Sequence, residues 1–376
     1  MLVPYTPQAF YYIVGENLEN PLRLIELFAG YGSQALALKY LGIPFEHHFV
    51  CEFDKYAIQS YNDIHGTDFE VSDIKNISAE DLNITDTENY KYLLTYSFPC
   101  TDLSMAGKRK GMQRESGTSS SLLWEVERLL KECKELPQYL LMENVPQVIG
   151  KNNISLFGEW CQFLTTLGYT NYYKLLNAKD FGIPQNRERC FMVSILQSEN
   201  KEFVFPNKQE LTKSFYDIKE CVVDEKLFLS NDVVHRISKW KSYQNPLNSI
   251  ISDGIVPTIT ARGAGELHSG MQLVFDDFEI DGVGGSYKYW RNIGVVNVIP
   301  TIKTSAYLAV ALQNKLRKIT PRECFRLMGV KDKDYNKLSC SDPQKYKQAG
   351  NSIVVDVLMA IFENMFIKDC KSNKLF

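Results

Sequence analysis

The first half of the chain alternates short apolar runs with amphipathic segments, and this order restricts the folds available to it. Residues 22–28 (LRLIELF) form an apolar run that ends at Ala-Gly, as a buried parallel strand does. Further strands are predicted at 48–53, 92–98, 139–144 and 190–196. Helices are predicted at 33–41, between Asp54 and Gly66, at 121–133 and at 156–167. Strands that alternate with helices predict an α/β fold with a doubly wound, mostly parallel sheet.

The second half of the chain has a different pattern. From about residue 197 to 318 the predicted strands are short and separated by turns, and glycine is dense between 254 and 285. Trp, Tyr and Ile remain frequent there, which indicates an irregular folded region rather than disorder. An apolar helix at 352–366 is expected to pack back on the sheet. We therefore predict two domains: residues 1–197 plus 345–376, and a second, smaller, irregular β-rich domain at 198–344.

Composition is that of a globular protein without a membrane partner. Of the 376 residues, 44% are hydrophobic and 23% are charged, which is ordinary for a folded protein. No apolar run approaches the ~20 residues that a membrane helix needs, and the N-terminal segment carries no secretory signal pattern. We expect a cytoplasmic protein. The nine cysteines show no C-x2-C spacing, which predicts reduced thiols and neither a disulfide framework nor a metal site.

The net charge of −3 does not by itself indicate a nucleic-acid-binding protein. Binding depends on a local basic surface rather than on the total charge, and two runs could supply one. Residues 107–114 (GKRKGMQR) carry four positive charges and no negative one, and residues 314–326 (NKLRKITPRECFR) carry five against Glu323 alone. For each run taken alone, a solvated surface without a ligand is the favoured interpretation.

A glycine loop between the first strand and the first helix predicts a cofactor site. In F28-A29-G30-Y31-G32, two glycines allow a tight turn and a close approach of the backbone to a ligand at a helix N-terminus. Glu52 ends the next strand, where a carboxylate can bind the ribose hydroxyls of an adenosine group, and Phe53 could stack on adenine. Gly30, Gly32 and Ala35 also satisfy the G-x-G-x-x-G/A pattern of dinucleotide-binding enzymes. This loop alone therefore leaves a hydride-transferring dehydrogenase open, and a glycine turn without any cofactor is the third alternative.

Cys100 is the candidate nucleophile. It follows Pro99 at the end of the predicted strand 92–98 and precedes a polar, basic loop. A cysteine at such a position, near backbone amides and cations, can be held as a thiolate and attack an electrophile. Most single cysteines are small core residues, and this interpretation fits four others because apolar residues surround them: Cys51, Cys133, Cys161 and Cys190.

A carboxylate and two arginines complete the candidate chemistry. Glu143 ends the strand 139–144, where it could hold or share a proton, although a helix-capping acid before Pro146 is a competing interpretation. Arg187 and Arg189 lie two residues apart before the next strand and would face the same side in extended backbone; a charged strand entrance is the alternative. A thiolate that adds to C6, an acid at N3 and an arginine at O2 are what methylation of cytosine C5 requires.

With these motifs in this order, the chain resembles the DNA cytosine-5 methyltransferase family over nearly its whole length. FAGYG (28–32) and EFD (52–54) resemble the family's cofactor motifs, with Ser33 and Phe53 where glycine and tryptophan are common. SFPCTDLS (97–104) resembles the nucleophile loop, with Thr101 in place of the frequent glutamine. MENV (142–145), QNRER (185–189), TPRECFRLMG (320–329) and AGNSIVV (349–355) resemble four further motifs. Proline-cysteine, ENV and QNRER together are highly specific, and a dehydrogenase explains none of them.

The resemblance implies the fold, the activity and the site. The fold is a Rossmann-like methyltransferase sheet of seven strands with a target-recognition domain. The activity is transfer of a methyl group from S-adenosylmethionine to C5 of a cytosine flipped out of a short, specific DNA sequence, through a bond from Cys100 to C6. The implied catalytic residues are Cys100, Glu143, Arg187 and Arg189. The implied cofactor residues are Phe28, Ala29, Gly30, Gly32, Glu52, Phe53, Asp73, Pro99, Leu122, Asn351 and Ser352. The expected DNA contacts are Lys108, Arg109, Lys110, Arg114 and Arg262.

Double-stranded DNA is the expected partner of a monomeric chain, with a cognate restriction endonuclease as a further candidate. A tRNA cytosine-5 methyltransferase of the same fold is the nearer alternative, and a non-catalytic DNA-binding protein of this fold is another. The recognition segment of about 120 residues and the sequence SFPCTDLS favour DNA. Intact Cys100, Glu143 and Arg189 argue against a non-catalytic protein. The sequence predicts neither the DNA sequence recognised nor the base that removes the C5 proton.

Overall fold

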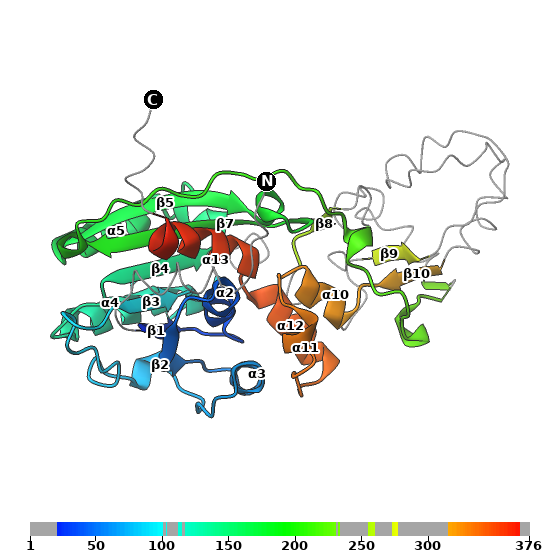
Figure 1. The fold of residues 1–376 in the computed structure, drawn as a ribbon, viewed down its shortest axis with the longest axis horizontal. Helices are drawn as coiled ribbons and strands as arrows, with labels where there is room; N and C mark the ends of the chain where they lie inside the picture. Colours follow the sequence, from blue (N-terminus) through cyan, green and yellow to red (C-terminus); the bar gives the residue numbers. More distant parts are fainter. Residues whose placement is uncertain are drawn as a thin grey trace, which may run out of the picture. The chain divides into compact units, whose positions relative to one another are not determined.

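A six-stranded sheet forms the centre of the first half of the protein (Figure 1). The computed structural model describes residues 21–100, 103, 112–114, 117–230, 232–233, 255–259, 273–276 and 315–368. The strand order is β2-β1-β3-β4-β7-β5. The strands are β1 (Leu22–Leu27), β2 (Phe45–Cys51), β3 (Tyr92–Tyr96), β4 (Tyr139–Asn144), β5 (Tyr169–Asn177) and β7 (Glu188–Leu196).

The pairing of these strands confirms an α/β, Rossmann-like fold. Strands β2, β1, β3 and β4 run parallel, whereas β7 is antiparallel to both β4 and β5. Strand β5 was not predicted from the sequence because it is a largely exposed edge strand without a continuous apolar run. The family resemblance implied seven strands; among the described residues this sheet has six.

The helices connect these strands much as predicted. They are α2 (Ser33–Leu41), α3 (Lys55–His65), α4 (Leu123–Glu132) and α5 (Ile154–Thr166). The carboxylate of Asp54 accepts a hydrogen bond from the backbone N–H of Tyr56, which caps the start of α3, and Gly66 ends the helix in the left-handed region. Short 3₁₀ helices occupy Ile74–Asn76 (η1), Ser119–Leu122 (η2), Pro146–Ile149 (η3), Ala178–Phe181 (η4), Gln197–Glu199 (η5), Phe215–Asp217 (η6) and Glu225–Leu227 (η7).

Apolar side chains cover both faces of the sheet. Ile25 and Leu27 of β1 join alternate residues of β3 and β4 in a core cluster with Leu129 of α4 and Trp160 of α5. On the other face, α13 (Val355–Phe362) packs against α2. Helices on both faces make the sheet doubly wound, which places the carboxyl ends of β1, β3 and β4 at one edge.

The final helix packs back on the sheet, as predicted. Its buried side chains include Val357, Leu358 and Ile361, and Phe366 of the following π-helical turn η9 (Glu363–Ile367) contacts the ring of Tyr139 on β4. The stretch Asp342–Ile367 is apolar and long enough to span a membrane by composition alone. Since its α13 portion is buried in the fold, the composition reflects a core helix of the protein.

The chain divides into two compact units, each containing the described part of several segments. The first unit comprises Met1–Asn177, Glu188–Lys208 and Ile353–Phe376, and the second Ala178–Arg187 and Gln209–Ser352. The second unit has short strands and helices: β6 (Gln185–Asn186), β8 (Val256–Pro257), β9 (Leu273–Asp276), β10 (Lys315–Lys318), α10 (Pro321–Arg326), α11 (Asp332–Tyr335) and α12 (Asp342–Asn351). Strand β6 pairs with β8 and β9 pairs with β10.

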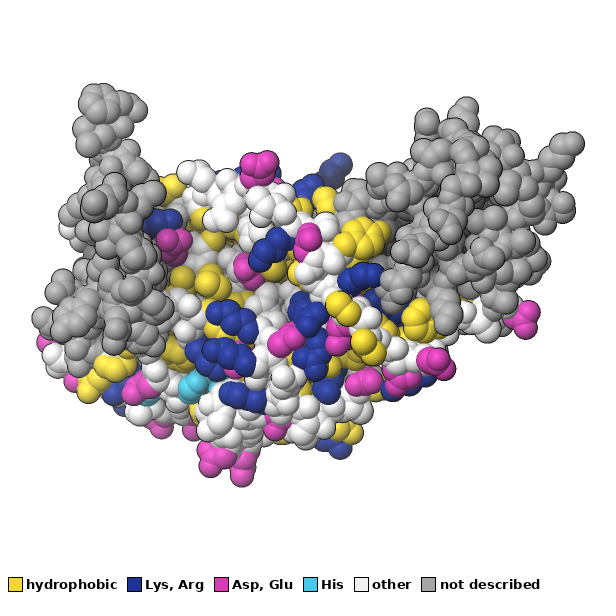
Figure 2. Space-filling view, turned by 45° about the vertical axis from the view of Figure 1, so that its right-hand side comes forward, with side chains coloured by type: hydrophobic (Ala, Val, Ile, Leu, Met, Phe, Trp, Pro, Cys, Tyr) yellow, Lys and Arg dark blue, Asp and Glu magenta, His cyan; other side chains and the backbone are white. Residues whose placement is uncertain are grey.

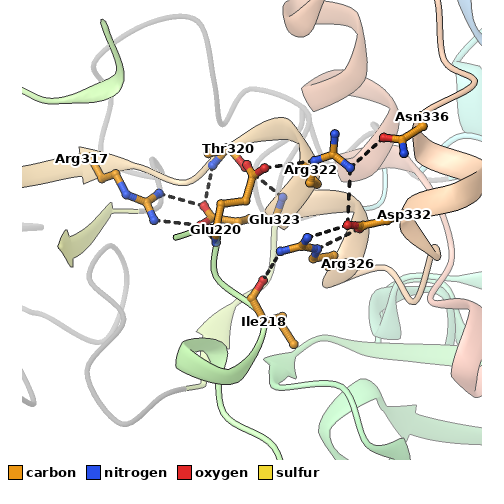
Figure 3. Close-up of polar contacts among 9 residues, drawn as sticks. All are labelled: Ile218, Glu220, Arg317, Thr320, Arg322, Glu323, Arg326, Asp332 and Asn336. Carbon is orange, nitrogen blue, oxygen red and sulfur yellow. Dashed lines mark hydrogen bonds and ion pairs between the residues drawn. The ribbon is translucent and has the colours of Figure 1, made fainter. Parts of the chain in front are cut away.

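A buried ion pair organises the second unit (Figure 3). The guanidinium of Arg317 on β10 donates two hydrogen bonds of 2.8 Å to the carboxylate of Glu323 on α10, and both side chains are fully buried. The carboxylate also accepts the backbone N–H groups of Thr320 and Glu220, at 2.7 and 2.9 Å. Both carboxylate oxygens thus accept two hydrogen bonds each, the full capacity of the group.

Two further arginines of the same run are also paired. Arg322 contacts the carboxylate of Glu220 at 3.0 Å, and Arg326 donates to both carboxylate oxygens of Asp332, at 2.9 and 2.6 Å (Figure 3). With Arg317 buried against Glu323, these pairs correct the sequence interpretation of residues 314–326 as a basic surface. Two of the three acids that pair with the run, Glu220 and Asp332, lie outside it, so the run by itself did not reveal them.

Candidate active site

The glycine loop after β1 has an unusual backbone. Phe28, Gly30 and Gly32 all have positive φ angles, of 60°, 58° and 80°. For Phe28 this left-handed conformation is strained, and such strain persists only where the surrounding structure enforces it. The loop is held by two backbone hydrogen bonds, from Ala29 N–H to the Cys51 carbonyl at 3.1 Å and from Gly32 N–H to the Ala29 carbonyl at 3.0 Å.

The two loop glycines are required for different reasons. A Cβ atom on Gly32 would lie 2.4 Å from Nε2 of His65 and 2.7 Å from the ring of Tyr61, so this glycine permits close packing against α3. A Cβ atom on Gly30 would meet no atom within 4 Å. The space over Gly30 is therefore open to a ligand that approaches the backbone closely.

Glu52 fastens this loop to the end of β2. Its carboxylate accepts the backbone N–H of Gly30 on one oxygen and that of Asp54 on the other, both at 2.8 Å. Burial raises the pKa of Glu52, and the hydrogen bonds from these N–H groups act in the opposite direction. A carboxylate offers about four acceptor positions, so the same group can also accept a ligand hydroxyl.

The other predicted cofactor residues of the first unit have varied environments. Phe53 is 73% exposed, which is unusual for an aromatic side chain and leaves its ring available for stacking. Asp73 is half-buried and caps η1 by accepting the backbone N–H of Lys75 at 3.0 Å. Leu122 is half-buried against the core cluster and Pro99 is half-buried beside Cys100. An open glycine backbone, a carboxylate at the strand end and an exposed ring fit an adenosine-bearing cofactor.

Cys100 lies just beyond the carboxyl end of β3, half-buried at the margin of the core cluster. Hydrogen bonds fix the backbone on both sides of it. The Phe98 carbonyl accepts from Nδ2 of Asn144 at 3.0 Å, and the Pro99 carbonyl accepts from Oγ of Ser120 at 2.7 Å. The Cys100 carbonyl accepts from the backbone N–H of Leu103 at 3.0 Å. Cys100 is thus half-buried on a backbone that these hydrogen bonds constrain.

The four cysteines interpreted as core residues are in fact wholly or partly buried. Burial raises the pKa of the Cys51, Cys133 and Cys161 thiols to about 11 and that of Cys190 to about 12. These thiols stay protonated and unreactive near neutral pH. Cys100 is half-buried in the segment beyond the end of β3, whereas Cys51 and Cys190 are buried within β2 and β7.

Glu143 and Arg189 form an ion pair at that same edge. Nε of Arg189 lies 3.2 Å from Oε1 of Glu143, and the two side chains are 16% and 10% exposed. Antiparallel pairing of β4 and β7 aligns Asn144 with Cys190, which brings the start of β7 to the end of β4. The hydrogen bond from Asn144 to the Phe98 carbonyl joins this edge to the segment that carries Cys100. The segment that carries Cys100 and the Glu143–Arg189 pair therefore lie at the same edge of the sheet.

Arg187 has a different environment from Arg189. It is almost fully buried in the second unit, where its guanidinium donates to the backbone carbonyls of Ile259, Gly350 and Ser352, at 3.0, 3.1 and 2.6 Å. The expectation that both arginines face one substrate is corrected accordingly, because Arg187 is committed to backbone oxygens. By this contact it holds the segment containing Asn351, which is exposed, and Ser352, which is buried.

Of the predicted DNA contacts, Lys108, Arg109, Lys110 and Arg262 lie outside the described residues. Arg114 is half-exposed, pairs with the Glu127 carboxylate at 2.6 Å and lies over the ring of Trp124, with Cζ 3.8 Å from the ring centroid. Its charge is thus partly neutralised within the first unit. On the face drawn in Figure 2, Lys and Arg side chains are interspersed with Asp and Glu.

Known proteins are similar to this chain over most of its length. A sequence profile of the C-5 cytosine-specific DNA methylase family matches residues 22–367. The type II methyltransferase M2.ScrFI from Lactococcus lactis subsp. cremoris is 36% identical over 92% of this chain and 99% of its own length. The orphan methyltransferase M.SssI from Spiroplasma monobiae is 30% identical, over 93% and 98%. The solved structure of the Entamoeba histolytica methyltransferase EhMeth has the same fold, with a TM-score of 0.71, 18% identity and coverage of 93% of this chain and 100% of that one.

The chain belongs to the C-5 cytosine-specific DNA methylase family. It is a DNA cytosine-5 methyltransferase, and enzymes of this family take their methyl group from S-adenosylmethionine. The hydride-transferring dehydrogenase that the glycine loop alone left open is therefore excluded. The fit of the loop to an adenosine group agrees with this cofactor.

Two residues that position the site were not singled out in the sequence. Asn144 and Ser120 hold successive carbonyls next to Cys100. For Asn144 a signal existed, since an amide following a glutamate at the end of an apolar strand must find buried partners. For Ser120 none existed, because it is one of three consecutive serines and only the fold shows which of them reaches Pro99.

Proposed function

We propose that the enzyme methylates C5 of a cytosine everted from a short, specific sequence in double-stranded DNA, through a covalent bond between Sγ of Cys100 and C6 of the base. The observation that carries this proposal is the placement of Cys100 on a fixed backbone at the sheet edge that also carries the Glu143–Arg189 pair. A nucleophile, a proton donor and a cation at one edge match the needs of addition to a pyrimidine ring.

The proposed reaction assigns one role to each of these residues. The Cys100 thiolate adds to C6, while the Glu143 carboxyl group at N3 supplies a hydrogen bond or proton and the Arg189 guanidinium stabilises charge at O2. Bound S-adenosylmethionine supplies an electrophilic methyl group for C5. Removal of the C5 proton by a base then allows the Cys100–C6 bond to break, which restores the aromatic ring and the thiol.

The cofactor is proposed to bind over the glycine loop. Gly30 would allow its close approach, the Glu52 carboxylate would accept a ribose hydroxyl, and the Phe53 ring would stack on adenine. The further cofactor residues proposed from the family resemblance are Phe28, Ala29, Gly32, Asp73, Pro99, Leu122, Asn351 and Ser352. Arg187 is proposed to act indirectly, by holding the carbonyls of Gly350 and Ser352 around Asn351.

The second unit is proposed to read the DNA sequence. This role is supported by the family resemblance, in which the corresponding segment is variable and contacts base edges in the major groove. Lys108, Arg109, Lys110 and Arg262 are proposed to contact DNA, whereas Arg114 would first have to leave Glu127. A monomer acting on the nucleoid in the cytoplasm, with or without a cognate restriction endonuclease, is the proposed setting.

Covalent trapping tests the central step. DNA that carries 5-fluorocytosine in its recognition site lacks the C5 proton, so the enzyme–DNA adduct should accumulate in the presence of S-adenosylmethionine. The wild-type protein is expected to form a complex that survives denaturing electrophoresis, and Cys100→Ala is expected to form none. Cys133→Ala is a matched control, since burial raises the pKa of that thiol to about 11. A persistent adduct with Cys100→Ala would contradict the assignment.

The substrate class is tested with S-adenosylmethionine tritiated in its methyl group. Double-stranded DNA of mixed sequence is expected to accept label, and tRNA is expected to remain unlabelled. Bisulfite sequencing of DNA from cells that express the protein identifies the methylated sequence. Label in tRNA but not in DNA would instead support the tRNA methyltransferase alternative.

A further inference from the structure

The backbone carbonyl oxygens of residues 98–100 accept hydrogen bonds from three different parts of the first unit. Phe98 accepts from Asn144 of β4, Pro99 accepts from Ser120 of η2, and Cys100 accepts from the backbone of Leu103. These three hydrogen bonds restrict the backbone conformation at Cys100.

The contact from Ser120 acts on the one dihedral angle of Pro99 that remains soft. The proline ring locks φ near −65°, and the peptide bond is planar, so only ψ of Pro99 can vary freely. Rotation about ψ moves the Pro99 carbonyl and simultaneously redirects the following peptide and the Cα–Cβ bond of Cys100. A hydrogen bond of 2.7 Å to that carbonyl therefore restrains the peptide that leads into Cys100, from which the thiol projects.

Ser120 is well placed to act as such a restraint. Its side chain is fully buried, and it comes from η2 (Ser119–Leu122), which leads directly into α4. Helix α4 is anchored in the core cluster by Leu123, Val126 and Leu129. The bond joins Pro99 directly to this rigid element, so the restraint does not depend on the intervening residues.

We propose that Ser120 is a positioning residue that restrains the backbone carrying the Cys100 thiol by holding the Pro99 carbonyl. This inference rests on the proposed role of Cys100 as the nucleophile. Addition to C6 requires the sulfur to meet the ring at the correct distance and angle, and a misplacement of about 1 Å can lower a rate by about 100-fold. Loss of the hydroxyl should therefore slow adduct formation while leaving cofactor and DNA binding intact.

The neighbouring serine offers a matched control. Ser121 donates its hydroxyl to the Thr118 carbonyl at 2.7 Å, a local contact that does not reach the Cys100 segment. Ser120→Ala and Ser121→Ala remove the same group, one residue apart, from the same 3₁₀ helix. Ser120→Thr restores a hydroxyl at the position in question.

The experiment measures single-turnover adduct formation on DNA that contains 5-fluorocytosine, together with kcat, KM for DNA, the affinity for S-adenosylmethionine and the Tm. We expect Ser120→Ala to slow adduct formation and kcat by about 10- to 100-fold, with KM, cofactor affinity and Tm close to those of Ser121→Ala. Ser121→Ala is expected to match the wild-type rate. Ser120→Thr is expected to recover most of the lost rate.

Two results would overturn the inference. One is an unchanged rate of adduct formation in Ser120→Ala. The other is a parallel loss of cofactor binding, DNA binding and Tm in Ser120→Ala, which would make Ser120 a general structural residue. If the extra methyl of Ser120→Thr lowers the Tm, the two alanine variants still decide the question. Failure of the proposed function would look different, because the wild-type protein itself would then form no adduct through Cys100.

Discussion

Two glutamate–arginine ion pairs in this protein differ in burial and in how the protein binds their carboxylates. In the second unit, Glu323 and Arg317 are fully buried, and the carboxylate accepts four hydrogen bonds of 2.7–2.9 Å. In the first unit, Glu143 and Arg189 meet at 3.2 Å, at the edge of the sheet, and keep 10% and 16% of their side-chain surface exposed.

This difference suits the two pairs to different roles, one structural and one chemical. The Glu323 carboxylate is saturated by protein donors, so it joins β10, α10 and the chain at residue 220 and has no acceptor position left for a ligand. The Glu143–Arg189 pair retains contact with solvent at the sheet edge where β3, the strand before Cys100, also ends. A charged pair that a substrate can reach is suited to proton sharing and charge stabilisation, whereas an enclosed pair is suited to holding chain segments together.

The largest expected effect is the loss of turnover in Glu143→Gln. The amide keeps the shape of the side chain and an oxygen for Arg189, but it cannot hold a proton for N3 of the base. Loss of a general acid typically costs about 10²- to 10⁴-fold in rate, so kcat should fall within that range. The free energy of unfolding should change by only about 1 kcal/mol, because one hydrogen-bond acceptor is retained.

Methyl transfer to DNA and urea unfolding measure these two quantities. Glu188→Gln is a suitable control, because Glu188 is exposed and lies next to Arg189 in the sequence. A Glu143→Gln protein with wild-type kcat would show that the exposed pair, like the buried one, serves only the fold.

The same substitution at the buried pair should have the reverse effect. In Glu323→Gln the amide NH₂ would face the N–H groups that now donate to the carboxylate. The Arg317 charge would then remain buried without its counter-charge. Breaking a buried pair in this way typically costs about 3–5 kcal/mol, so the free energy of unfolding should fall by about that amount. Urea unfolding measures it, and kcat of the fraction that stays folded should be little changed. A stability close to that of wild type would contradict the role of Glu323 as a scaffold.

The smallest effect is expected at the half-exposed pair of Arg326 and Asp332. The hydrogen bonds from Arg326 lower the pKa of the Asp332 carboxyl, whose side chain is 42% exposed. A lowered folded-state pKa means that the pair stabilises the fold above the unfolded-state pKa and that this stabilisation is lost as pH falls through the folded-state pKa. Solvent screening keeps the contribution below about 1 kcal/mol.

Asp332→Asn should therefore reduce stability slightly at pH 7, and its difference from wild type should shrink as the solution becomes acidic. Urea unfolding at several pH values tests this, with added salt reducing the difference at pH 7. A difference that grows with acidity would have the wrong sign for a carboxyl with a lowered pKa.

Much of the first unit could be predicted because its elements carry local signals. Strand β4 has the predicted bounds, and α3 lies between its predicted N-cap Asp54 and Gly66. Strand β5 was missed because an exposed edge strand needs no apolar run. The basic run at 314–326 was misjudged because its counter-charges, Glu220 and Asp332, lie elsewhere in the sequence.

The site could be predicted only in part. The sequence could group Cys100, Glu143 and Arg189 at one edge because the carboxyl ends of neighbouring parallel strands meet there in an α/β topology. Arg187 was grouped with Arg189 because alternation in extended backbone was all that the sequence offered, and its three carbonyl partners come from residues 72 to 165 positions away.

The amino-acid sequence determined the order of strands and helices, the residues that can carry chemistry and the family to which the enzyme belongs, because periodicity, capping and motif spacing are local properties. Only the tertiary structure decided which arginine faces a carboxylate and which is fixed to carbonyls, and which of three serines holds Pro99. Burial and hydrogen-bond partners arise from contacts between distant segments, and these exist only after the chain has folded.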